Sequence, residues 1–120
     1  MHPALETFLK EYQIWLKATE DKCDTTQQAF DEIKQEVSKN GITEELLKEL
    51  FHLSHSLFQT NYLLMESHMR VNNIRANYSK EEQEIIDDYN EIAAEASRLI
   101  RAISAYEASC KKVDEERLEV

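Results

Sequence analysis

Apolar or small side chains recur at alternating spacings of four and three residues in three long runs that together span most of the chain. The first run contains Leu5, Leu9, Tyr12, Leu16, Thr19, Cys23, Thr26, Phe30, Ile33 and Val37. The second contains Leu46, Leu50, Leu53, Leu57, Thr60, Leu64, Ser67, Val71, Ile74 and Tyr78, and the third contains Ile85, Tyr89, Ile92, Ala96, Leu99, Ile103, Tyr106, Cys110 and Val113. This heptad spacing is typical of long helices that pack side by side.

Residues that end or begin helices separate the three runs. Gly41 follows the first run and suits a left-handed helix cap, and Thr43 suits the first position of the next helix. Ser79, with Glu82 three residues later, forms a capping-box pattern before the third run. We therefore predict helices over about 3–39, 43–77 and 80–117.

The composition agrees with an all-α fold. The 120 residues include one glycine and one proline, so few turns are available, and 42% hydrophobic content suffices for a core. Short connections make neighbouring helices antiparallel. We predict one domain over 1–120, an elongated antiparallel three-helix bundle with coiled-coil-like packing. The alternative is a four-helix form in which the second or third helix is broken.

The charge of the chain argues against two classes of partner. A net charge of −10, with basic residues scattered along the chain, disfavours nucleic acid and anionic membranes. The start of the chain lacks a signal-peptide pattern, and no apolar stretch is long enough to span a membrane. Cys23 and Cys110 show no metal-ligand spacing, and we expect both to be buried free thiols. A cytoplasmic location follows as the expectation.

Candidate chemistry is sparse. Glu49 and His52 have the Glu-x-x-His spacing of diiron bundles, and His55 lies one helical turn beyond His52. A second Glu-x-x-His copy is missing, and two histidines alone make a weak metal site, so these three residues are weak metal candidates. The sequence shows no nucleophile arrangement and no glycine-rich phosphate loop. We therefore expect a protein that is not an enzyme and has no cofactor.

The middle helix carries a second apolar line at the same spacing, offset by about 100° from the first. It consists of Phe51, His55, Phe58, Tyr62, Met65 and Met69. A smaller line on the third helix contains Ile86, Ala93 and Ile100. One interpretation is that a middle helix touches two neighbours and needs a broad apolar face. The other is that part of the line stays exposed as a docking surface, since aromatic residues and Met are enriched at interfaces.

Two segments resemble known families. The segment from Phe8 to Leu16, Phe-Leu-Lys-Glu-Tyr-Gln-Ile-Trp-Leu, resembles the first helix of a spectrin-type repeat, although the third helix lacks the second Trp common in that family. The three long helices and the segment Asn61-Tyr-Leu-Leu-Met65 are similar to flagellar and type III export chaperones. The second resemblance implies a chaperone that binds protein. Neither assigns the chain to a family.

These observations predict a non-enzymatic helical interaction protein, such as an adaptor, chaperone or regulator. It would bind an amphipathic helix of another protein, or a second copy of itself as a homodimer, through Phe51, His55, Phe58, Tyr62, Met65 and Met69, with Ile86 and Ile100 as further candidates. The alternatives are a bundle of the export-chaperone kind and a bundle that binds a metal or small ligand.

Overall fold

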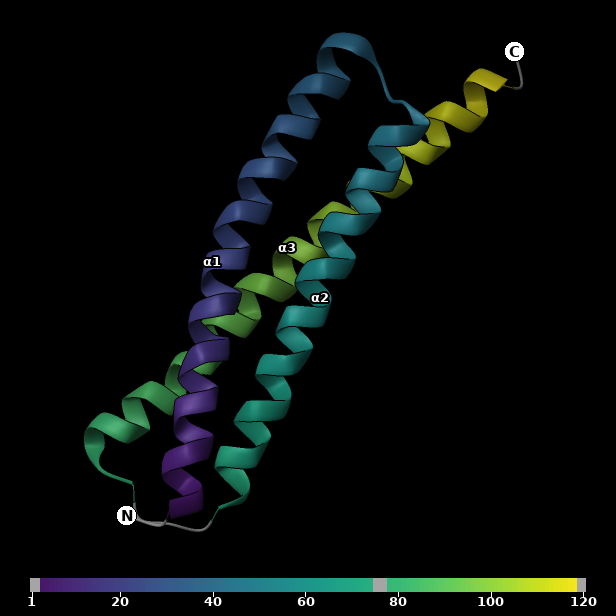
Figure 1. Cartoon of the computed structure of the whole chain (residues 1–120). Coiled ribbons are helices and arrows are strands. Elements are labelled where there is room, and N and C mark those ends of the chain that lie inside the picture. Colours follow the sequence, from purple (N-terminus) through teal and green to yellow (C-terminus); the bar gives the residue numbers. More distant parts are fainter. Residues whose placement is uncertain (1–2, 75–77, 119–120) are drawn as a thin grey trace.

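The computed structural model describes residues 3–74 and 78–118, and its elements in these ranges are three α-helices. Helix α1 spans Pro3–Asn40, α2 spans Glu44–Asn73 and α3 spans Lys80–Leu118. The chain runs along α1, returns along α2 and runs back along α3, so neighbouring helices are antiparallel (Figure 1). The molecule measures 66 × 21 × 17 Å. The predicted elongated all-α three-helix bundle is confirmed.

The predicted caps are present at both helix starts and at the end of α1. Gly41 has a φ of 81°, in the left-handed region, and its N–H donates to the carbonyl of Val37. The Thr43 side chain accepts a hydrogen bond from the N–H of Leu46 at 3.2 Å. Ser79 and Glu82 exchange side-chain-to-backbone hydrogen bonds of 2.9 and 3.1 Å, which completes the capping box.

Helix α2 ends earlier than predicted. Asn73 is its last residue and Ile74 has an extended backbone, whereas the spacing predicted a helix to 77. The N–H of Ile74 donates to the carbonyl of Val71, and the Tyr78 hydroxyl donates to the carbonyls of both residues. Tyr78 thus satisfies backbone acceptors that a longer helix would have paired internally. Positions 75–77 of the prediction lie outside the described residues.

Helix α2 is the central element of the packing. It lies along both α1 and α3, whereas α3 crosses α1 obliquely and contacts it less (Figure 1). Four residues at a seven-residue spacing on α2 are fully buried, with no exposed surface: Leu50, Leu57, Leu64 and Val71. This one row of α2 therefore packs against both α1 and α3.

The core consists of two clusters with a small polar waist between them. One cluster includes Cys23, Phe30, Ile33, Leu50, Leu57, Ile103 and Cys110. The other, near the start of α1, includes Leu5, Leu9, Tyr12, Leu64, Val71 and Ile86. At the waist, the hydroxyls of Thr19 and Thr60 donate to the carbonyls of Trp15 and Ser56 in their own helices. In the described ranges, no helix has the length and apolar character needed to cross a membrane.

Candidate interaction face on the second helix

The line Phe51, His55, Phe58, Tyr62, Met65 and Met69, here called the α2 face, lies largely at the surface. Phe51, Phe58, Tyr62 and Met69 expose between 47% and 54% of their surface. His55 is exposed and Met65 is half-buried. The physical reason is that the Leu50-to-Val71 row already fills the contacts with α1 and α3, and the α2 face points about 100° away from it. The aromatic and Met side chains are thus left without an intramolecular partner surface of matching size.

The side chains of the α2 face are partly organised by local contacts. The rings of Phe51 and His55 stack with 5.5 Å between centroids and 9° between planes. Further along, Phe58, Gln59, Tyr62 and Leu63 line an open hollow of about 520 Å³. A hydrogen bond to the Glu66 carboxylate raises the pKa of the Tyr62 hydroxyl. Local contacts thus fix the Phe51 ring toward one end of the face and the Tyr62 ring on the other side of its middle.

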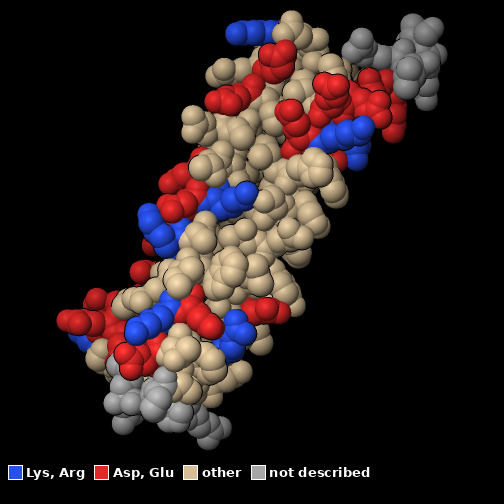
Figure 2. All heavy atoms as spheres, viewed as in Figure 1, with Lys and Arg blue, Asp and Glu red and all other residues tan. Residues whose placement is uncertain are grey.

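Most of the α2 face lies in the longest stretch of the sequence without a charged residue. No Asp, Glu, Lys or Arg occurs between Leu50 and Met65, although 32% of all residues are charged. Figure 2 shows the consequence: charged side chains gather toward the ends and one edge, and a broad uncharged area covers the middle, where α2 runs. Leu63, 36% exposed, belongs to this area and was missed in the spacing pattern. The sequence shows this absence of charge, and a prediction based on it would have added Leu63 to the α2 face.

The two candidates on α3 are placed differently from those on α2. Ile86 is 3% exposed and belongs to the cluster near the start of α1, and the Tyr12 hydroxyl donates to its carbonyl oxygen at 2.9 Å. The prediction that Ile86 lies on a binding surface is therefore wrong, because α3 crosses α1 at this level and the Ile86 side chain is buried between them. Ile100 is half-buried and packs against the other core cluster.

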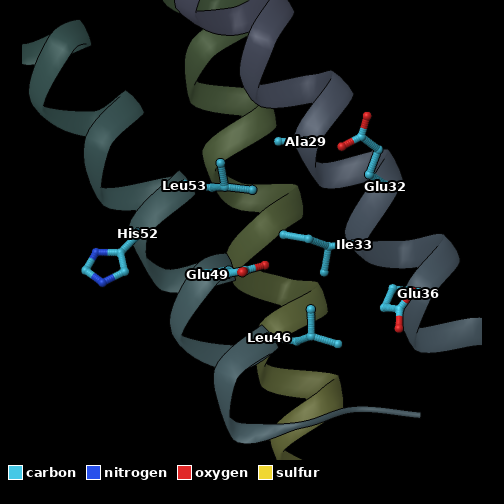
Figure 3. Close-up of a pocket in the computed structure, with 8 residues that line it drawn as sticks. All are labelled: Ala29, Glu32, Ile33, Glu36, Leu46, Glu49, His52 and Leu53. Atoms are coloured by element: carbon cyan, nitrogen blue, oxygen red, sulfur yellow. The ribbon is translucent and has the colours of Figure 1, made fainter. Parts of the chain in front are cut away.

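The weak metal candidates do not converge. Glu49 and His52 line a groove of about 440 Å³ between α1 and α2, together with Glu32, Glu36 and four apolar residues. Figure 3 shows the His52 ring pointing away from α1 and from the two glutamates on it. His55 is stacked on Phe51. Among the described residues, no group of three or more His, Cys, Asp or Glu side chains is arranged to hold a metal ion.

The two cysteines are buried free thiols within one core cluster. Burial raises the pKa of Cys23 to about 11, and the nearby Glu95 acts in the same direction. Burial also raises the pKa of Cys110. Both thiols are therefore poor nucleophiles, since the thiolate is the reactive form.

A histidine to which the sequence pattern assigned no role is built into the packing. The His68 ring stacks on Tyr89 of α3, with 3.9 Å between centroids and 10° between planes, and lies 5.8 Å from the Tyr12 ring of α1. Burial lowers its pKa, and the charge of Asp87 opposes this shift. The spacing could not reveal this role because it depends on three helices meeting.

Taken together, these residues form a half-exposed, largely uncharged apolar surface along α2. Such a surface buries aromatic and Met side chains and needs no charged partner. Comparisons with models of protein families, with curated proteins and with solved structures found no match to this chain.

Proposed function

We propose that this chain is a non-enzymatic helical interaction protein, acting as an adaptor, chaperone or regulator, that binds an amphipathic helix through the α2 face. The observation that carries the proposal is the row of half-exposed aromatic and Met side chains on an uncharged stretch of α2. The core of the bundle is filled without this row, since the Leu50-to-Val71 row is fully buried. The row therefore has a use beyond holding the three helices together.

Burial of apolar area would supply the binding free energy. Phe51, Phe58 and Tyr62 are about half exposed, and a buried aromatic side chain covers ~150–250 Å². Each ring thus has on the order of 100 Å² to bury, which is worth about 2.5 kcal/mol at 25 cal/mol per Å². An amphipathic helix with apolar residues at four-three spacing matches the row in shape.

The cysteines are consistent with a reducing compartment. Cys23 and Cys110 are both unpaired, and free thiols persist in the cytoplasm. The proposal therefore places the protein there.

Photocrosslinking tests the proposal. A benzophenone amino acid replaces Phe58 in one version of the protein and Ile14 in a control version. Ile14 is 66% exposed on α1, but its helical neighbours are the charged residues Lys10, Glu11 and Lys17. Both versions are irradiated in an extract of cells that naturally make the protein and, separately, after purification. We expect the probe at 58, and not the probe at 14, to capture one protein segment that mass spectrometry identifies as an amphipathic helix.

The controls decide the outcome. Adding Tyr62→Asp to the version with the probe at 58 should abolish capture while the helical circular dichroism signal is unchanged, because Tyr62 is a surface residue. Equal capture from positions 58 and 14, or capture that survives Tyr62→Asp, would overturn the proposal. So would a lack of any α2-dependent product in both the extract and the purified sample.

A further inference from the structure

The residues of the α2 face are arranged symmetrically about the level of Thr60. Phe58 and Tyr62 each lie two residues from Thr60, and His55 and Met65 each lie five residues from it. Phe51 and Met69 each lie nine residues away. The spacing of the face is therefore the same in both directions along α2. This is the property that a self-complementary, two-fold symmetric interface requires.

An antiparallel pair of α2 helices uses this symmetry. With a two-fold axis at the level of Thr60, a residue that precedes Thr60 by a given number of positions lies opposite the residue of the second copy that follows Thr60 by the same number. Phe58 then meets Tyr62 of the second copy, at two equivalent places beside the axis. Outward from the axis, His55 meets Met65 and Phe51 meets Met69. Each large side chain finds an apolar or aromatic counterpart, and no position of the face is left unmatched.

The polar side chains that flank the α2 face favour the antiparallel direction. Glu49 points into the groove between α1 and α2, away from a second copy placed on the α2 face. At 1.5 Å per residue, His52 of one copy lies within about 3 Å, along the axis, of the level of Glu66 in the second copy. His52, Glu66 and Arg70 lie on the same flank of α2 by helical spacing. A parallel pair would instead place Glu66 against Glu66 and Arg70 against Arg70.

The overall charge points to the same face. Two copies that each carry a net charge of −10 repel one another wherever acidic residues meet. The stretch from Leu50 to Met65 lacks carboxylates, so contact there brings no acidic side chains together across the centre of the interface. The central, uncharged area in Figure 2 is thus where a second copy is accommodated with the least repulsion.

The area available suits a reversible dimer. Phe51, Phe58, Tyr62 and Met69 are about half exposed and contribute on the order of 100 Å² each. With the flanking side chains, two copies bury roughly 1,200 Å², at the lower end of stable specific interfaces.

We propose that the helix bound by the α2 face is α2 of a second copy, in an antiparallel homodimer with its two-fold axis at the level of Thr60. This inference rests on the proposed function, since it names the occupant of the same surface.

Sedimentation equilibrium over a range of protein concentrations tests whether the dimer exists. We expect a concentration-dependent monomer–dimer equilibrium for the natural chain. Phe58→Asp should weaken dimerisation at least a hundredfold, because the change occurs twice in the interface next to the axis. Ile14→Asp, on an exposed position of α1, is the matched control and should leave the equilibrium unchanged.

Site-directed cysteines test the direction of pairing with a short bismaleimide. Gln59→Cys should crosslink to itself, because two copies of this position meet beside the axis. His52→Cys alone should not, since its two copies lie about 24 Å apart along an antiparallel pair. A mixture of His52→Cys and Glu66→Cys chains should crosslink to each other. The parent protein, whose two cysteines are buried, serves as the blank.

Each outcome bears on one of the two proposals. A monomer at all concentrations overturns the homodimer, and the proposed function then stands if the probe at 58 captures a different protein's helix in the extract. A dimer that survives Phe58→Asp, or one in which His52→Cys crosslinks to itself, overturns the antiparallel α2 pairing. A dimer with the expected crosslinks supports both proposals.

Discussion

Adjacent residues on α2 have opposite environments. Leu64 has no exposed surface and belongs to a core cluster, whereas Leu63, its neighbour in the chain, is 36% exposed beside Phe58 and Tyr62. The difference follows from the 100° turn per residue, which places consecutive side chains on different faces. Residue identity alone therefore did not separate core from surface on this helix. The position of each residue relative to the Leu50-to-Val71 row did.

His68 predicts a pH dependence of folding stability. Burial lowers its pKa in the folded protein below the ordinary value of 6.5, so the unfolded chain binds its proton at a higher pH. The contribution of this residue to stability is complete above about 6.5 and declines as the pH falls toward the folded pKa.

Urea unfolding at several pH values between 5 and 8 measures this effect. His68→Phe keeps a ring against Tyr89 and removes the titration, so its stability should fall less steeply with decreasing pH than that of the natural chain. The two proteins share every other titrating group. Parallel stability curves for both would show that His68 is not responsible.

At the level of single helices, local sequence signals account for most of the observed boundaries. Thr43 caps α2 and the Ser79–Glu82 pair caps α3, as their residue types predicted. The end of α2 was predicted too late because the heptad spacing continues through Ile74 and Tyr78. There the side chain of Tyr78 bonds to backbone carbonyls of Val71 and Ile74, an interaction that spacing does not encode.

The cap at the start of α2 predicts a measurable loss of stability. Thr43→Ala removes the side-chain acceptor of the Leu46 N–H and should lower the free energy of unfolding by about 1 kcal/mol. Thr43→Ser keeps a hydroxyl at the same position and should retain most of the stability. Denaturant unfolding followed by circular dichroism measures both. Equal losses for Ala and Ser would show that the hydrogen bond is not the source of the effect.

The whole molecule is a rod with two core clusters rather than one compact core. Thr19 and Thr60 lie between the clusters, and their hydroxyls are satisfied within their own helices. The waist thus contributes little apolar contact between helices. Because the clusters share no side chains, a substitution in one should have little influence on how much a substitution in the other lowers the stability.

Two conservative core changes test this independence. Ile103→Val in one cluster and Ile86→Val in the other should each lower the free energy of unfolding by about 0.5–1.5 kcal/mol. Their positions on α3 are about 25 Å apart at 1.5 Å per residue. The double variant should lose the sum of the two within ~0.5 kcal/mol. A departure of more than about 1 kcal/mol from that sum would show that the clusters act as one core.

The class of fold and most of its local features follow from the chain alone. The four-three spacing, the single Gly41 and the capping residues specify three long antiparallel helices, because these signals act through contacts a few residues apart. The α2 face was recognisable as a second apolar row, but its exposure was not. An apolar residue beside the core row is buried or exposed according to where the neighbouring helices cross. The oblique path of α3 buried Ile86 against α1 and left Phe58 at the surface. Crossing angles arise from the packing of all three helices at once, and so the row that stays exposed is settled at the level of the assembled bundle.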